Sequence, residues 1–392
     1  MNNKSIIDRI VNSILDVLPK GKNFYPLHEP SFEGNEWKYL KECLDTGWVS
    51  SVGKYVDEFE KKLADFTGAK MAIAAVNGTS ALQICLKIVG VTTGDEVLTN
   101  ALTFVATSNA ISYCGGIPHY VDSNEKTLGL CPISLRAYLK EIAELRNNEC
   151  FNRKTGNRIK ALVPMHVFGH PADIDPLLEV ANEFSISAVE DAAESLGSYY
   201  KGKHTGTFGK ISALSFNGNK TITTGGGGAI LTNDSELGRL AKHLTTTAKV
   251  PHKWEFFHDM IGYNFRLPNI CAALGCAQLE QLPGFIQKKR MLAEKYKNAF
   301  NDIPEVRFVT EPSFGKSNYW LNTLIFRKDF SHLRDDLLEK TNSMGIQTRP
   351  AWRLNSDLPM FQNCPKMALP VAEYLEKSVV NIPSSSNLIP SE

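Results

Sequence analysis

Short apolar runs alternate with stretches of helical periodicity between residues 71 and 216, and this alternation constrains the fold more than any other feature. Each apolar run is short and bounded by turn residues, as expected of buried strands. Strands that alternate with helices are typical of α/β proteins, in which a mostly parallel sheet lies between helices. We therefore predict an α/β fold. The predicted strands are 71–76, 96–98, 118–121, 159–163, 186–190 and 211–216.

The chain divides into three predicted parts. Residues 1–25 form an amphipathic helical extension, because apolar residues from Ile6 to Leu18 recur at helical spacing. We expect this helix to pack on the body of the protein or on a partner subunit, with binding to a membrane surface as the alternative. Residues 26–282 form a large domain that contains the sheet. Residues 283–392 form a smaller α+β domain that begins with a helix over 286–300.

Lys220 follows a predicted strand and the turn Asn217-Gly218-Asn219, and four glycines follow it at 225–228. A lysine amine in a partly desolvated pocket loses its proton more readily and becomes a nucleophile for an aldehyde. One alternative is an ordinary exposed turn lysine. A triphosphate-binding loop is excluded, because Asn219 stands where that motif requires glycine.

Two other strand ends carry polar residues suited to a ligand. Asp191 ends the run 186–190, and ligands of open α/β sheets bind at the carboxyl ends of strands. A buried aspartate needs a cationic partner, such as a protonated ring nitrogen, although Asp191 is equally suited to capping a helix. Asn77-Gly78-Thr79-Ser80 joins a strand to a helical pattern, which is the usual setting of a phosphate site.

Together these segments resemble the DegT/DnrJ/EryC1/StrS aminotransferases, which use pyridoxal phosphate (PLP). The resemblance implies an aminotransferase of fold type I, whose large domain holds a mostly parallel seven-stranded sheet flanked by helices. The motifs that carry it occur in family order: GWVSSVG at 47–53, NGTSAL at 77–82, TFVAT at 103–107, EDAAE at 190–194, SFN at 215–217 with Lys220, TTGGGG at 223–228 and GYNFRL at 262–267.

The resemblance implies a role for each matching residue. Lys220 is the Schiff-base lysine, and Asp191 is the partner of the pyridine nitrogen. Many relatives carry glutamine at the place of Glu194, where it bonds the phenolic oxygen of the cofactor. The other implied cofactor contacts are Thr79, Ser80 and Ser215 at the phosphate, Phe104 and Ala193 on the two ring faces, Asn264 reaching the phosphate of a second subunit, and Gly78 and Asn217.

The segments 26–30, 245–254 and 348–352 resemble aminotransferases of the legionaminic acid and bacillosamine pathways. This implies a ping-pong transfer from glutamate to C4 of a nucleotide-linked 4-keto-6-deoxy sugar, with UDP-2-acetamido-2,6-dideoxy-hexos-4-ulose as the expected substrate, in a homodimer with shared active sites. Two alternatives are a sugar dehydratase of the same fold and a non-catalytic regulator. The family's dehydratases carry histidine in place of the lysine, so Lys220 argues against the first.

Four further side chains are candidates for gripping substrate, namely His166, Arg266, Tyr319 and Arg349. His166 and His170 lie four residues apart, but the intervening Val167-Phe168-Gly169 follows a strand and makes a helical zinc pair improbable. We therefore predict no metal site.

The composition excludes some partners. The chain of 392 residues has 43 basic and 42 acidic side chains, so nothing indicates a nucleic-acid or membrane-surface partner. The eight cysteines show no paired metal spacing, as expected of reduced core residues in a cytoplasmic protein.

Overall fold

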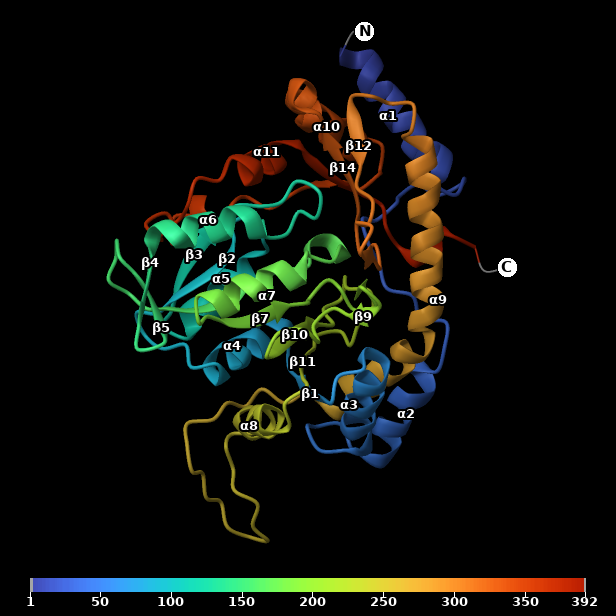
Figure 1. The fold of residues 1–392 in the computed structure, drawn as a ribbon. Helices are drawn as coiled ribbons and strands as arrows, with labels where there is room; N and C mark the ends of the chain where they lie inside the picture. The colour runs from blue at the N-terminus through green and yellow to red at the C-terminus, as the bar shows by residue number, and fades with distance from the viewer. Residues whose placement is uncertain (1–2, 391–392) are drawn as a thin grey trace.

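A seven-stranded sheet with helices on both faces forms the large lobe of the computed structural model, which describes residues 3–390 (Figure 1). The strand order is β1-β11-β10-β7-β6-β2-β3. The strands from β10 to β3 are parallel to one another, and β11 is antiparallel to both of its neighbours. All six predicted strands are present. The strands are β1 (Met71–Ala75), β2 (Glu96–Asn100), β3 (Ile117–Val121), β6 (Ile159–Val163), β7 (Ser187–Asp191), β10 (Ile211–Ser215) and β11 (Gly228–Thr232).

Both faces of this sheet are buried, which explains why its strands are almost wholly apolar. Helices α4 (Gly78–Ile88), α5 (Val105–Tyr113) and α8 (Ser235–Thr245) cover one face. Helices α3 (Lys54–Thr67), α6 (Pro132–Ile142), α7 (Ile174–Glu183) and the first half of α9 (Asn269–Ala299) cover the other. The alternation is visible within β1, where Ile73 packs towards α4 while Ala72 and Ala74 pack towards α3.

The smaller lobe holds the antiparallel sheet β12-β14-β16-β15, in line with the predicted α+β domain. Helix α9 runs through both lobes, so the predicted boundary at residue 283 falls inside a continuous helix. The helix begins earlier than predicted because Ala272, Cys276 and Leu279 bury an apolar stripe ahead of Pro283. The elements of this lobe are β12 (Val306–Phe308), β14 (Asn322–Phe326), α10 (Arg334–Ser343), β15 (Arg349–Pro350), α11 (Pro370–Ser378) and β16 (Val379–Ile382).

The amino-terminal helix α1 (Asn3–Val17) packs on the body of the protein, beside α9 and α10 (Figure 1). Ile6, Ile10 and Ile14 are buried against Leu292, Tyr296 and other residues of the smaller lobe. The apolar stripe of α1 is therefore buried against the smaller lobe of the same chain. The helix α2 (Glu36–Thr46) lies at the far end of α9.

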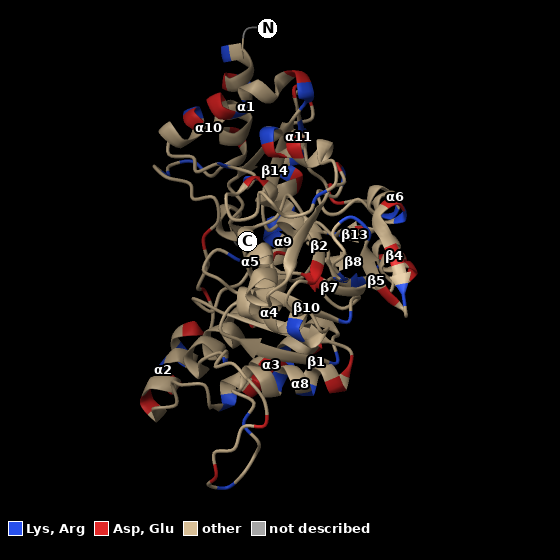
Figure 2. Cartoon of the chain, turned by 90° about the vertical axis from the view of Figure 1, so that its left-hand side faces the viewer, with Lys and Arg blue, Asp and Glu red and all other residues tan. Residues whose placement is uncertain are grey.

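Two small sheets complete the fold. One is the hairpin of β4 (Ala143–Arg146) and β5 (Glu149–Asn152), and the other joins β8 (Tyr199–Tyr200), β9 (Lys203–His204) and β13 (Gly315–Lys316). Basic and acidic residues are interspersed over the face shown in Figure 2, in keeping with the balanced charge. Within residues 3–390, no helix has the length and apolarity needed to cross a membrane.

Candidate active site

A cavity of about 310 Å³ lies at the carboxyl ends of the parallel strands. The loops after β1, β7 and β10 line it, together with the start of α5 and two tryptophans, Trp320 and Trp352. The carboxyl ends of parallel strands meet at one edge of a sheet, and ligands of α/β proteins bind at that edge. The fold thus brings the predicted lysine, aspartate and phosphate segment together.

Lys220 projects into this cavity from a tight turn. Its backbone N–H donates to the Asn217 carbonyl at 2.9 Å, which closes the turn after β10. The Nζ atom lies 3.3 Å from Glu194 Oε1 and 3.9 Å from the centre of the Trp320 ring. The side chain is 14% exposed, so Lys220 is not the ordinary exposed turn lysine of the alternative interpretation.

Asp191 ends β7 with its carboxylate held by two donors. Thr107 Oγ1 donates to Asp191 Oδ2 at 2.7 Å, and the Ala193 N–H donates to Oδ1 at 3.2 Å. The residue is 5% exposed and lines the cavity. The second bond resembles a helix cap, but no α-helix follows Asp191 directly. An oriented and buried carboxylate is suited to pairing with a cationic ring nitrogen.

The first turn of α4 leaves two backbone donors at the cavity. Asn77 caps the helix, since its side chain accepts from the Ser80 N–H at 2.7 Å and its carbonyl accepts from the Ala81 N–H at 3.1 Å. Gly78 and Thr79 line the cavity, and within residues 3–390 their N–H groups have no hydrogen-bond partner. A helix N-terminus with free amides is a ready anion site.

Glycine is required at 78 by the closeness of β10. A Cβ there would lie 2.9 Å from Cβ of Ser215, which is too close for two carbons. Ser215 itself lines the cavity, as do Asn217, Phe104 and Ala193. Ser80 does not line it, and its amide is already bound by Asn77. Its position therefore does not support the predicted phosphate contact.

Glu194 is a buried carboxyl at the floor of the cavity. It is 2% exposed, and its Oε2 accepts from the Phe168 N–H at 2.9 Å. Burial raises the pKa of this carboxyl to about 7, although the nearby Lys220 ammonium opposes the shift. The carboxyl thus exchanges a proton near neutral pH.

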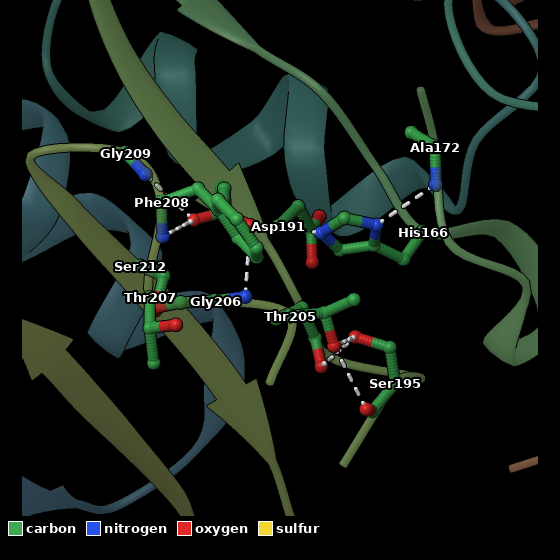
Figure 3. Close-up of polar contacts among 12 residues, drawn as sticks. His166, Ala172, Asp191, Ser195, Thr205, Gly206, Thr207, Phe208, Gly209 and Ser212 are labelled. Atoms are coloured by element: carbon green, nitrogen blue, oxygen red, sulfur yellow. Dashed lines mark hydrogen bonds and ion pairs between the residues drawn. The ribbon is translucent and has the colours of Figure 1, made fainter. Parts of the chain in front are cut away.

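His166 lies beneath the site and not in it, which corrects the prediction that it grips substrate. The ring is wholly buried, and its Nδ1 accepts from the Ala172 N–H at 3.1 Å (Figure 3). Its Nε2 lies 3.0 Å from Glu190 Oε2. Glu190 also accepts the N–H groups of Gly206, Phe208 and Gly209. The carboxylate of Glu190 therefore turns the ring away from the cavity.

The other predicted substrate residues also lie outside the cavity. Arg266 lines a separate hollow beside α3, and Arg349 is exposed on β15, where it donates to Asn342. Tyr319 is buried, and its hydroxyl accepts the Glu311 N–H. Asn264 is exposed and does not line the cavity of its own chain.

Three functional side chains were not predicted from the sequence as parts of the site. Thr107 orients Asp191, and Met165 lines the cavity beside them. Trp320 comes from the smaller lobe, stacks over the Lys220 amine and donates from Nε1 to the Asn219 carbonyl at 2.7 Å. The TFVAT motif contains Thr107, but nothing local in the sequence indicates that Trp320 reaches this loop.

The arrangement fits PLP. The α4 terminus offers amides for a phosphate, Asp191 offers a carboxylate for a ring nitrogen, and Lys220 offers an amine for an aldehyde. Phe104, half exposed at the start of α5, and Ala193 are placed to contact a flat ring. The fold and this site define the class of PLP-dependent transferases.

Comparison with known proteins gives the family. Residues 30–392 match the DegT/DnrJ/EryC1/StrS aminotransferase family, and the chain belongs to it. GDP-perosamine synthase of Escherichia coli O157:H7 is 38% identical over 93% of this chain and 94% of its own length. EpsN of Bacillus subtilis (strain 168), named as pyridoxal phosphate-dependent, is 35% identical over 93% and 92%. The structure of Helicobacter pylori PseC, an aminotransferase involved in pseudaminic acid biosynthesis, covers 93% of this chain and 94% of its own with 27% identity and a TM-score of 0.84.

The predicted family, fold class and cofactor are therefore confirmed. The protein is a PLP-dependent sugar aminotransferase.

Proposed function

We propose that the protein transfers an amino group from glutamate to C4 of a nucleotide-linked 4-keto-6-deoxy sugar for surface-glycan synthesis in the cytoplasm. The observation that carries the proposal is the shared cavity of Lys220, Asp191 and the α4 N-terminus. Bound PLP supplies an aldehyde that joins to amines and a ring that withdraws electrons from the reacting carbon. The protein supplies the groups that hold it and move protons.

Each group has a proposed task that follows from its position. The free amides of Gly78 and Thr79 bind the phosphate, with the Ser215 hydroxyl beside them. Asp191, held by Thr107, keeps a proton on the ring nitrogen. With PLP bound, Lys220 Nζ would be the group that takes the proton from the substrate carbon and returns it.

One cavity serves both substrates in turn, and so we propose ping-pong kinetics. Glutamate leaves as 2-oxoglutarate before the ketosugar enters, and the same Lys220 amine acts as base in both halves. Initial rates at several fixed concentrations of glutamate should give parallel double-reciprocal lines. Intersecting lines would rule out this order.

The sequence resemblance favours a uridine nucleotide, whereas the relative from Escherichia coli carries GDP in its name. We take the guanosine diphosphate sugar as the first candidate and the uridine diphosphate sugar as the second. The test is to mix the PLP-loaded protein with glutamate and each 4-keto-6-deoxy sugar nucleotide, and to measure the aminated sugar by mass spectrometry. If neither sugar is aminated while glutamate changes the cofactor absorbance, the proposed acceptor is wrong and transamination stands.

We also propose a homodimer in which Asn264 reaches the partner's phosphate site. It is supported by the exposure of Asn264 and by the apolar side chains Trp254, Phe256, Phe257 and Ile261, which lie exposed on the arm that projects beyond α8 (Figure 1). Several large apolar side chains exposed on one segment are typical of a protein interface.

Mixed dimers test the shared site. Lys220→Ala and Asn264→Ala proteins should each be inactive. After the two are unfolded and refolded together, half of the dimers should contain one chain of each kind, and one of the two sites in such a dimer is intact. The mixture should therefore regain about a quarter of wild-type activity. No recovery from a mixture shown to be dimeric would contradict the sharing of sites.

A further inference from the structure

The Lys220 amine and the Glu194 carboxyl form a close and nearly buried pair. Lys220 Nζ lies 3.3 Å from Glu194 Oε1, and the two side chains are 14% and 1% exposed. Oε1 points to the amine because Oε2 is fixed by the Phe168 N–H at 2.9 Å. The Asn318 side chain donates to the Glu194 carbonyl at 2.9 Å and holds its backbone. The geometry is that of a proton donor and an acceptor held for each other.

The charges around this pair come from three elements. Asp191, three residues before Glu194, adds a second carboxylate, whose negative charge acts with burial to raise the pKa of Glu194. On the Lys220 side, the Trp320 ring stacks over the amine, and the Trp320 carbonyl is bound by the buried Lys289. The half-buried His28 has its pKa lowered by desolvation and by the charges of Lys289 and Lys220.

An ammonium has no lone pair and cannot attack an aldehyde, so Lys220 must first lose a proton. Transfer to Glu194 converts a buried ion pair into a neutral amine and a neutral carboxylic acid. Burial in a medium of low dielectric penalises the ion pair more than the neutral pair, which brings the two states closer in free energy. The same transfer in water between an exposed lysine and an exposed glutamate is much less favourable.

We propose that Glu194 is the base that takes the proton from the Lys220 ammonium and so prepares the amine to join the cofactor. One N–H bond of Nζ breaks, one O–H bond forms on Oε1, and the lone pair remains on nitrogen. No other reactant is needed. The inference rests on the PLP chemistry of the proposed function, and it concerns the loading of the cofactor without any sugar.

The test follows the uptake of PLP by cofactor-free protein through the absorbance change, from pH 6 to pH 9. Glu194→Gln keeps the shape of the side chain and an oxygen for the Phe168 N–H, but it cannot take a proton. We expect uptake at pH 7.5 to slow about 100-fold, the lower range for a lost positioned base. The difference in uptake rate between wild type and Glu194→Gln should become smaller towards pH 9, because hydroxide can then take the proton from the Lys220 ammonium.

Wild-type protein gives a second measurement that does not depend on the folding of a variant. Borohydride trapping with peptide mass mapping gives the rate at which Lys220 is labelled. That rate should fall as the pH drops through about 7, because Glu194 is then already protonated and cannot accept a second proton. A wild-type rate that is flat across this range, or a folded Glu194→Gln protein that loads as fast as wild type, overturns the proposal.

Failure here and failure of the proposed function remain distinguishable. Loss of amination with normal loading would reject the sugar substrate only, and normal amination with unchanged loading in Glu194→Gln would reject the role of Glu194 only.

Discussion

Lys289 offers a prediction whose size follows from the structure. Its ammonium is wholly buried on α9, where Nζ donates to the carbonyls of Trp320 at 3.1 Å and Ser384 at 2.5 Å. Burial lowers the pKa of Lys289 from 10.5 to about 7. The unfolded chain therefore binds more protons than the folded protein between pH 7 and pH 10.5, and stability should rise with pH in that window.

The slope approaches 1.36 kcal/mol per pH unit, so the free energy of unfolding should gain about 1.5–2 kcal/mol between pH 7 and pH 8.5. Lys289→Met fills the same space without a charge and should lose this gain. The exposed Lys295 on the same helix provides a matched control, because Lys295→Met should keep the wild-type slope. Urea unfolding at both pH values measures the difference.

Lys289→Met also leaves the carbonyls of Trp320 and Ser384 without a donor, which lowers the stability at every pH. The proteins are therefore compared by how much their unfolding free energy changes with pH, and not by its absolute value. Buried thiols with raised pKa values lower the stability as the pH approaches their unfolded pKa of about 9, but they do so equally in all three proteins, so the difference from Lys289→Met isolates the lysine. A Lys289→Met protein that gains as much stability as wild type between pH 7 and pH 8.5 would refute the reasoning.

Three substitutions test the cavity. Thr107→Val removes one of the two donors to Asp191 and should weaken PLP binding about tenfold, roughly 1.5 kcal/mol. Thr107→Ser keeps the hydroxyl and should bind PLP as wild type does. A fluorescence titration that gives the same affinity for wild type and both variants would contradict this. Gly78→Ala crowds β10 and should weaken PLP binding at the phosphate, while binding of pyridoxal, which has no phosphate, should change little. Trp320→Phe keeps a ring over the lysine but loses the bond to Asn219, which should cost about 1 kcal/mol of unfolding free energy, and an unchanged urea midpoint would count against that bond.

The large lobe and the meeting of Lys220 with Asp191 were predictable because each follows a strand of strongly apolar sequence. Parallel strands place their carboxyl ends at one edge, so local patterns there translate directly into proximity. The order of the seven motifs along the chain then indicated the family. The roles assigned to these side chains from the resemblance remain predictions that the variants above test.

Other parts of the site depend on contacts between distant segments. Trp320 reaches the Asn219 carbonyl across a hundred residues of sequence, and no local pattern encodes that approach. His166 was misjudged because the Glu190 carboxylate, on a neighbouring strand, draws its ring under the sheet edge. The start of α9 was placed too late because Pro283 was taken as a beginning, although buried packing on both sides keeps the helix continuous.

The hairpin of β4 and β5 was not predicted from the sequence. Asn147 and Asn148 both have positive φ, at 51° and 64°, which is the conformation of a tight two-residue turn that asparagine tolerates well. The pair of asparagines was therefore the missed signal.

The passage of α9 through both hydrophobic cores limits how the molecule can move. A free rotation of one lobe against the other would have to break or bend this rod, so access to the buried lysine must come from smaller movements of loops at the mouth of the cavity. Pro283 supplies no N–H to the helical ladder and marks the point of least stiffness. Any flexing of the whole protein should therefore be centred at this proline.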